Sequence, residues 1–339
     1  MTILKRLRRS PLTLRWTLGV LAVLIALLLL SALLSLACGS VSIPLRNVAA
    51  VFLNDSSSTE AERTIILQIR LPRVLMGIAV GAGLSVAGLV FQALLRNPLA
   101  EPYILGISSG GTMGAVIAMS VTAGTGMFVP QLASFAGSAA VMVLVYAIAS
   151  RRGRLDTYTL LLAGVMIGAF FNAGVLVLIA VVNRDIRSAF LWLMGNLSNA
   201  DLSVALEVIP PVLLAAGILT AMAKRFNLIA TGEDSALQLG VNVRTLKKTS
   251  YALASLITGL VVSVSGVVGF VGLIIPHMCR LVFGPDHRLL LPASFLAGGT
   301  FMVLADLLSR IVLAPTEIPV GAVTAAIGAP VFIYLLRKT

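Results

Sequence analysis

Side chains that could carry out chemistry are sparse in this chain of 339 residues, which has 13 acidic residues, two histidines and two cysteines. His277 and Cys279 stand two positions apart, but no further ligand residue lies beside them, so we predict no metal site. The sequence shows neither a nucleophile next to a base nor a pair of carboxylates suited to acid–base catalysis. These observations predict that the protein is not an enzyme and has no catalytic residue.

Arginine is the residue type with the clearest capacity for recognition. Arg70 and Arg73 flank Pro72 in the motif RLPR, and Arg310 follows Asp306 by four residues. A guanidinium group forms paired hydrogen bonds with a carboxylate, so these arginines are expected either to dock an acidic protein surface or to anchor the chain at a membrane interface. Asp306 and Arg310 share a helix face and are expected to form a local ion pair. Pro72 suits the first position of a helix.

The longest polar stretch, KRFNLIATGEDSALQLGVNVRTLKK at 224–248, is basic at both ends. Its middle predicts a short helix with Thr231 as N-cap, Glu233 and Asp234 at the positive end of the helix dipole, and Gly240 at the C′ position. A helix placed here either transmits force to a soluble partner or only connects its neighbours.

Composition predicts the environment in which these residues lie. The chain is 58% hydrophobic and 11% charged, with a mean hydropathy of +1.03, whereas soluble domains have about 25% charged residues. This identifies a polytopic membrane protein. Its net charge of +12 comes from short basic clusters beside apolar runs, which is typical of contact with lipid headgroups and not with nucleic acid.

Ten apolar runs are about long enough to span a membrane. They lie at about 16–38, 72–95, 103–121, 128–150, 158–182, 203–223, 249–270, 272–284, 289–311 and 318–336. The first is interpreted as an uncleaved span. The fold class is therefore predicted as an all-α polytopic membrane protein of about ten transmembrane helices, and an even number of spans places both termini on one side.

The distribution of basic residues predicts which side that is. Of the 25 lysines and arginines, 18 fall on the side of the N-terminus and 7 on the other. Cytoplasmic loops are enriched in these residues, so both termini, including residues 1–15, and the stretch 224–248 are predicted to be cytoplasmic. The loop NPLAEP at 97–102 and the pair Thr157–Tyr158, which opens the fifth span, fall on the same side, where they could constrict a pathway from inside.

Two further patterns concern packing and energy supply. Small residues recur at a spacing of four, as in Gly77, Gly81 and Ser85, and such rows let helices approach closely in lipid. The chain contains no G-x-x-x-x-G-K-[S/T] loop, so a transport process driven by ATP would need a partner to hydrolyse it.

Taken together, the motifs resemble the permease subunit of type II ABC importers, the FecCD/BtuC-like family that takes up iron-siderophores, haem and vitamin B12. The resemblance extends from the second span to the C-terminus. It rests on RLPR (70–73), GLVFQALLRNPLAEPYILGISSGG (88–111), LLLAG (160–164), WLMGNLS (192–198), GEDSALQLGV (232–241), GFVGLIIPHMCR (269–280), LADLLSR (304–310) and EIPVGAVTAAIGAPVFIYLL (317–336).

The resemblance implies a BtuC-like bundle of ten helices that forms one permease domain over residues 1–339, in the cytoplasmic (inner) membrane of a bacterium or archaeon. It also implies a homodimer, two ATP-binding cassette subunits that use ATP and Mg, and a periplasmic or lipid-anchored binding protein. No cofactor is expected to be bound by this chain. The substrate expected is a bulky metal chelate, either an iron-siderophore or haem.

Carried over position by position, the resemblance also implies roles for individual residues. Docking of the binding protein would fall to Arg70, Arg73 and Arg310. Coupling to the ATPase would fall to Gly232, Glu233, Asp234, Ala236, Leu239, Gly240 and Val241. The cytoplasmic gate would comprise Asn97, Leu99, Thr157 and Tyr158, of which Tyr158 is bulkier than the small residue usual at its position.

Three alternatives stay open at this point. The same machinery could import vitamin B12 or another corrinoid. A secondary transporter that works without ATP would need broken helices or ionisable residues at mid-membrane depth, and only the glycine-rich break GVVGFVG at 266–272 favours it. A membrane-embedded enzyme is disfavoured by the missing catalytic residues.

Overall fold

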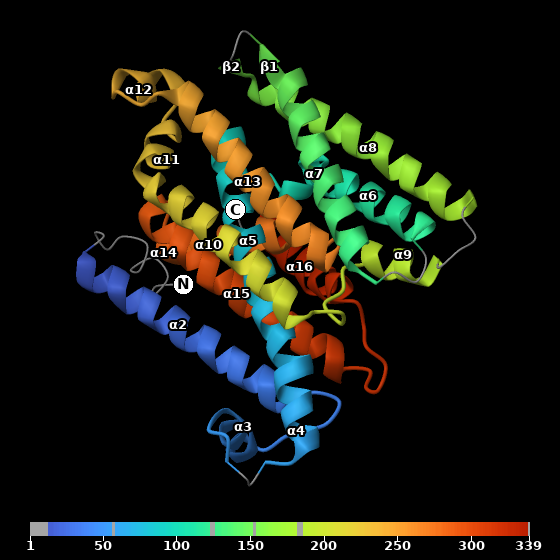
Figure 1. Cartoon of the computed structure of the whole chain (residues 1–339). Helices are drawn as coiled ribbons and strands as arrows, with labels where there is room; N and C mark the ends of the chain where they lie inside the picture. The colour runs from blue at the N-terminus through green and yellow to red at the C-terminus, as the bar shows by residue number, and fades with distance from the viewer. Residues whose placement is uncertain (1–12, 56–57, 123–125, 152–153, 182–185, 338–339) are drawn as a thin grey trace.

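A computed structural model describes residues 13–55, 58–122, 126–151, 154–181 and 186–337. Most of the predicted cytoplasmic N-terminus, residues 1–12, lies outside the described residues. The described chain is a bundle of tilted helices (Figure 1). The only strands among the described residues are β1 (Ser150–Arg151) and β2 (Arg154–Leu155), two short antiparallel segments.

Ten helices coincide with the ten predicted spans, which confirms the predicted fold class. Seven of them are long and apolar enough by themselves to cross a membrane, and three are shorter apolar helices. In chain order they are α2 (Leu14–Ala37), α5 (Leu71–Leu95), α6 (Ile107–Val121), α7 (Phe128–Ala149), α8 (Thr157–Val181), α10 (Leu202–Ala221), α13 (Val243–Ser265), α14 (Val271–Phe283), α15 (His287–Ile311) and α16 (Val320–Leu336).

Short elements connect these spans at the two ends of the bundle. They are α3 (Leu45–Phe52), α4 (Glu60–Thr64), the π-helix η1 (Ile65–Arg70), the 3₁₀-helix η2 (Pro102–Leu105), α9 (Ile186–Leu193), α11 (Ala223–Ile229) and α12 (Glu233–Gln238). Figure 1 shows α12 and the β1–β2 hairpin at one end of the molecule, and α3 and α4 at the opposite end. The predicted cytoplasmic stretch 224–248 and the start of the fifth span therefore share one end.

The second span begins earlier than the sequence predicted, and Pro72 does not start it. α4, η1 and α5 form one continuous helix of 36 residues from Glu60 to Leu95. Directly before the proline the helix widens into a π turn, in which the Leu71 N–H donates to the Ile66 carbonyl five residues back. The wider turn accommodates a proline ring that would clash with a carbonyl in a regular α-helix.

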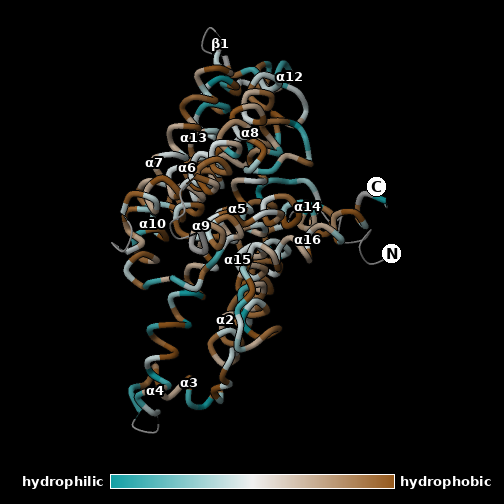
Figure 2. The backbone as a smooth tube through the Cα atoms, turned by 90° about the vertical axis from the view of Figure 1, so that its right-hand side faces the viewer, coloured by the Kyte–Doolittle hydropathy of each residue, from teal (hydrophilic) through white to brown (hydrophobic). Residues whose placement is uncertain are grey.

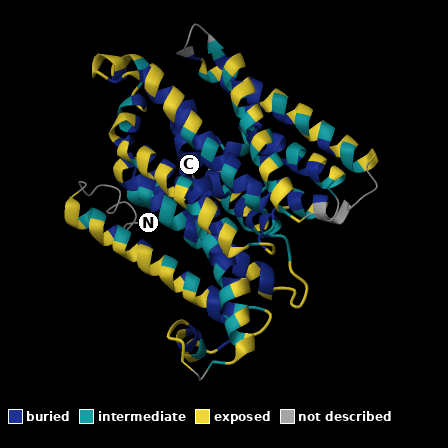
Figure 3. Ribbon diagram, in the orientation of Figure 1, coloured by how far each residue is buried: buried dark blue, intermediate teal, exposed yellow. Residues whose placement is uncertain are grey.

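α5 is the centre of the bundle. Nearly all of its residues are buried, and it packs against α10, α13, α14 and α15. In Figure 3 the buried colour is concentrated in the middle of the molecule, while the outer helices carry exposed faces. Those exposed faces are largely apolar, as the brown segments of α7, α8 and α10 in Figure 2 indicate. This arrangement suits a protein surrounded by lipid.

Glycines allow the close packing around α5, as the rows of small residues predicted. A Cβ atom added to Gly81 would collide with the carbonyl group of Gly298 in α15. One added to Gly88 would collide with the carbonyl of Gly272 in α14. Both collisions are with backbone atoms, which cannot rotate away, so these positions require glycine.

The predicted loop at 224–248 is more structured than expected at its C-terminal end. α13 begins at Val243, because the Asn242 side chain accepts a hydrogen bond from the Thr245 N–H at 3.0 Å and caps the helix.

α13 ends at Ser265, and the chain then runs without helix to Val271, where α14 begins. The glycine-rich stretch is therefore a true break between two helices.

Candidate functional site

The short helix predicted in the 224–248 stretch exists as α12, but its cap differs from the prediction. Gly232 is the N-cap, with φ of 124°, a conformation that glycine adopts without strain. The Thr231 hydroxyl donates instead to the Leu228 carbonyl, so Thr231 as N-cap was wrong. At the other end Gly240 has φ of 81° and lies at C′ as predicted. The Gly240 N–H donates to the Leu237 carbonyl at 3.0 Å and the Val241 N–H donates to the Ala236 carbonyl at 2.9 Å, and together these bonds form a Schellman motif.

α12 has an exposed apolar side and a buried side. Leu237 is 54% exposed and Leu239 is 63% exposed, and Asp234 is also exposed. Ala236 and Val241 are buried and join the main core. Figure 3 shows the α12 region mostly in the exposed colour at a corner of the molecule. Leu237 and Leu239 lie two positions apart and are both exposed, so they offer a small apolar surface that suits contact with a partner.

The inner side of α12 is joined to other elements by charged groups. Lys247 of α13 is buried, and its Nζ lies 2.6 Å from Glu233 Oε1. The same ammonium donates to Thr157 Oγ1 at 3.0 Å and to the Leu155 carbonyl at 3.3 Å. Arg96, at the end of α5, lies 3.6 Å from Glu233 Oε1. The first residue of α12 is thus connected to α13, α5 and the start of α8.

A cavity of about 780 Å³ lies against this cluster. It brings together three of the four predicted gate residues with one predicted coupling residue. Its lining includes Asn97, Thr157, Tyr158, Glu233, Lys247 and Arg96. The fourth gate residue, Leu99, is not among the lining residues, although its N–H donates to the Asn97 side chain at 2.9 Å. Residues predicted to form the gate and the coupling helix, although distant in sequence, therefore meet around one cavity.

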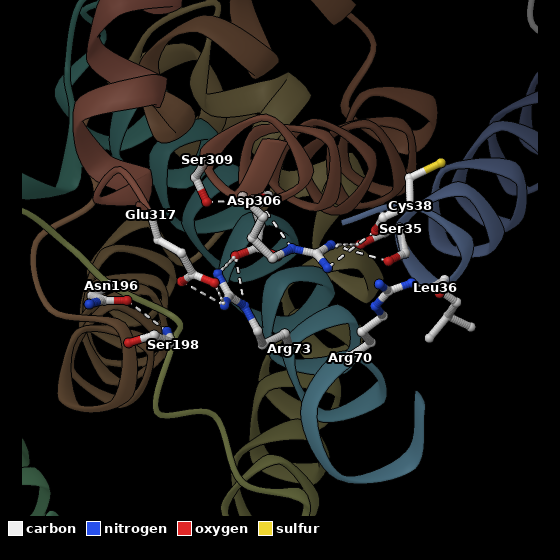
Figure 4. A network of polar contacts seen from close by, with 11 residues as sticks. Ser35, Leu36, Cys38, Arg70, Arg73, Asn196, Ser198, Asp306, Ser309 and Glu317 are labelled. Carbon is white, nitrogen blue, oxygen red and sulfur yellow. Dashed lines mark hydrogen bonds and ion pairs between the residues drawn. The ribbon is translucent and has the colours of Figure 1, made fainter. Parts of the chain in front are cut away.

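The predicted docking arginines lie near the opposite end of the bundle and are all buried. Figure 4 shows the polar contacts around Arg70 and Arg73. Arg73 of α5 donates from Nε and Nη2 to Asp306 Oδ1 at 3.2 and 2.8 Å. Its Nη1 donates to both carboxylate oxygens of Glu317 at 3.0 and 2.9 Å. Both edges of the guanidinium fork are therefore occupied by acids of this chain.

Arg310 and Arg70 complete this outer network. Arg310 Nε lies 3.1 Å from Asp306 Oδ2, which confirms the predicted local pair. The Arg310 guanidinium also donates to Ser35 at the end of α2. Arg70 forms no ion pair with an acid of the described residues and instead donates to the carbonyls of Leu36, Ala37 and Val41. These arginines fasten α2, α5 and α15 together, and docking of another protein stays a prediction for them.

A third constellation supports the helix break. Glu101 Oε1 accepts the Phe270 N–H at 2.5 Å, and the Tyr103 hydroxyl accepts the Val268 N–H at 2.7 Å. Phe270 has φ of 69°, unusual for a bulky residue. The loop that follows Asn97, a predicted gate residue, therefore holds the break between α13 and α14 through side chains.

Several of these residues were missed by sequence reasoning, for different reasons. Glu317 and Glu101 were read only as parts of longer motifs. Lys247 was assigned to a basic loop, yet it lies four residues from both Val243 and Tyr251, which are buried. A lysine on the buried face of a helix was the signal that could have identified it.

No three His, Cys, Asp or Glu side chains gather at a possible metal site within the ranges that the structure describes. That the chain binds no metal or cofactor stays a prediction.

Comparison with known proteins places this geometry in context. A model described as the FecCD transport family matches residues 27–338. The cobalamin import system permease protein BtuC of Halobacterium salinarum is 45% identical over 278 residues, which are 82% of this chain and 74% of that protein. The hemin transport system permease protein HmuU of Yersinia pestis is 38% identical over 315 residues, which are 91% of this chain and 94% of that protein.

A solved structure agrees over nearly the same extent. A metal-chelate type ABC transporter in an inward-facing conformation superposes on this chain with a TM-score of 0.82 at 31% sequence identity. The match covers 95% of this chain and 100% of the other.

Proposed function

Because the chain belongs to the FecCD transport family, we propose that it forms the translocation path of an ATP-driven importer for a bulky metal chelate. The chain is a multi-pass membrane protein of a family of transport permeases, and in this proposal it is the non-catalytic subunit. ATP would be hydrolysed by two cassette subunits on the cytoplasmic face. The observation that carries this proposal is α12, which exposes two leucines outward and is joined inward to the residues around the cytoplasmic cavity.

The proposed substrate class follows from the relatives. Their printed names include a cobalamin permease and a hemin permease, and the solved structure is of the metal-chelate type. Haem and an iron-siderophore therefore remain candidates for this chain, and the 45% identity to a cobalamin permease supports a corrinoid equally well. Uptake of cobalamin, haem and a ferric siderophore by cells that lack their own systems would assign the substrate.

The remaining partners belong to the same proposal. A second copy of the chain would complete the path, and α8 offers it a long apolar face that is mostly exposed. A periplasmic or lipid-anchored binding protein would dock at the end that carries α3 and α4. The assembly would lie in the cytoplasmic membrane of a bacterium or archaeon.

The mechanism proposed is alternating access. The binding protein delivers the chelate above the path between two copies of the chain. ATP-driven closure of the cassette subunits displaces α12, and the segments around the cytoplasmic cavity open or close in response. The low charge of the spans suits the passage of a large chelate.

The proposal predicts an ATPase gene beside the gene for this chain, and copurification of the two products tests it. Leu237→Asp with Leu239→Asp places charges on the exposed side of α12 without touching the Glu233–Lys247 pair, and should abolish both copurification and ATP-dependent uptake. Leu202→Asp makes the same change on an exposed residue at the far end of the bundle and should retain both. Normal copurification and uptake by the double variant would overturn the coupling role of α12.

One observation favours a second candidate, a transporter that works without ATP. The break between α13 and α14 leaves backbone without helix inside the bundle, as occurs in secondary transporters. Vesicles containing only this chain separate the two functions. Uptake driven by an ion gradient without ATPase or ATP would establish the ATP-independent transporter and refute the ATP-driven importer.

A further inference from the structure

Lys247 is a buried cation at the α12 end of the bundle, with a side chain that is 6% exposed. An ammonium group has three N–H donors. Three acceptors lie within reach of them, namely Glu233 Oε1, Thr157 Oγ1 and the Leu155 carbonyl. Every donor therefore has an acceptor inside this chain.

The three acceptors belong to segments that do different work in the proposed function. Glu233 is the first residue of α12, Thr157 is the first residue of α8, and Leu155 ends β2. Thr157 also lines the cavity and is a predicted gate residue. Lys247 is thus the single side chain that bonds to both the coupling helix and the start of the gate among the described residues.

The base of Lys247 is held rigidly. One turn further along α13, Tyr251 stacks on Tyr146 of α7 and packs edge-on against Phe91 of α5. The Tyr251 hydroxyl donates to the Met142 carbonyl at 3.0 Å. The backbone of α13 next to Lys247 is therefore anchored to the core, and only the flexible side chain of Lys247 can follow a displacement of α12.

A buried ammonium cannot easily lose its carboxylate, because an unpaired buried charge is strongly unfavourable. If α12 moves, Glu233 and Lys247 must stay together, and the contact between Lys247 and Thr157 must shift with them. The second cation near Glu233 cannot replace this connection, because the Arg96 side chain is 49% exposed and lies 3.6 Å away.

We propose that Lys247 is a positioning residue that transmits displacement of α12 to the start of α8 and thereby to the cytoplasmic gate. This inference rests on the proposed function and specifies which contact links ATP hydrolysis to the pathway. Lys247 contacts neither substrate nor nucleotide in this role.

The test measures substrate imported per ATP hydrolysed, with the full chain and its ATPase reconstituted in lipid vesicles. Lys247→Met should still bind the ATPase and allow hydrolysis, while imported substrate per ATP falls at least about fivefold, the lower end of typical coupling between sites. Lys248→Met is the matched control, since Lys248 is adjacent and exposed. Its import per ATP should stay within about twofold of wild type.

A second variant separates a loss of motion transfer from α12 to the gate from a loss of stability of the fold. Lys247→Met alone leaves Glu233 without its nearest partner and could destabilise the chain. Lys247→Met combined with Glu233→Met removes both charges and should restore stability, yet import per ATP should remain low.

A direct measurement follows the two segments. Spin labels at Gln238 on α12 and Leu162 on α8, both exposed, should keep a constant separation between nucleotide-free and ATP-bound wild type, because the segments move together. In the double variant that separation should change with nucleotide.

The outcomes are distinguishable. Failure of the wild-type chain to bind the ATPase would overturn the proposed function itself. A wild-type complex that imports normally, together with a double variant whose import per ATP is also normal, would overturn the role of Lys247 alone.

Discussion

Arg73 Nη2 lies 2.8 Å from Asp306 Oδ1, and the two side chains are only 4% and 1% exposed. The residues are 233 positions apart and join α5 to α15. Asp306 also pairs with Arg310, so one carboxylate serves two buried arginines. The stability of this end of the bundle should therefore depend on Asp306 more than on any single arginine.

Asp306→Asn is expected to lower the free energy of unfolding by about 3–5 kcal/mol, because it leaves buried guanidinium charge without its carboxylate. Thermal unfolding in detergent measures this. Asp234→Asn, which removes an exposed carboxylate from α12, serves as the control and should change stability by less than about 0.5 kcal/mol. Equal stability of the two variants would contradict the importance of the buried pair.

Glu317→Gln tests whether the outer arginines dock a binding protein. Arg73 donates from Nη1 to both Glu317 oxygens, so a docking carboxylate would have to displace Glu317. Removing that charge should tighten binding of the cognate binding protein, by about tenfold if one charged hydrogen bond is released, whereas Arg73→Gln should weaken binding. Surface plasmon resonance with the chain in nanodiscs measures both. Unchanged affinity in both variants would remove Arg73 from the docking site.

Two glycine substitutions of the same kind are expected to have opposite effects. Gly88→Ala introduces a Cβ that collides with the Gly272 backbone, and such overpacking costs about 1–3 kcal/mol. Gly217→Ala in α10 meets nothing within 4 Å and should stabilise the helix by about 0.5–1 kcal/mol. Denaturant unfolding of the two variants shows directly whether each substitution raises or lowers the free energy of unfolding. Stabilisation by Gly88→Ala would mean that α5 and α14 are less closely packed than the structure shows.

The stability contributed by Asp286 should depend on pH. Burial alone would raise the pKa of this carboxyl group, but hydrogen bonds from Arg288 and Asn227 outweigh it and lower the pKa to about 2. Since the ordinary pKa of an aspartate is about 3.9, the stabilisation is complete above about pH 4 and is lost as the pH falls towards 2.

Asp286→Asn, which changes the N-cap of α15, should accordingly lower the Tm at pH 7, and the difference from wild type should close by about pH 2. Scanning calorimetry over this range measures it. A difference that stayed constant from pH 7 to pH 2 would show that the charge of Asp286 has no part in stability.

The spans could be predicted because the membrane dictates their length and hydrophobicity. The prolines near Asn97 predicted that the chain forms a loop there. The i, i+4 spacing of Asp306 and Arg310 predicted their ion pair. Such features depend on residues close together in the chain, so a single sequence reveals them.

The errors have local physical causes of a different kind. Pro72 was predicted to start a helix, but a π turn directly before it allows the helix to continue through the proline. Thr231 looked like a cap, but Gly232 reaches a backbone conformation that threonine avoids. Partners such as Arg73 with Glu317, or Lys247 with Thr157, are separated by 244 and 90 positions. Only the packing of the bundle brings them together.

The network of buried arginines and acids at the outer end of the bundle should also influence how fast a binding protein associates with the chain. It holds three arginines but also Asp306 and Glu317, so a single positive charge remains, and the arginines lie buried while Glu317 is 42% exposed. Long-range attraction of an acidic protein needs exposed charge of one sign. Encounter at this mouth should therefore proceed at a rate that varies little with ionic strength, and affinity should be decided by the lifetime of the complex once formed.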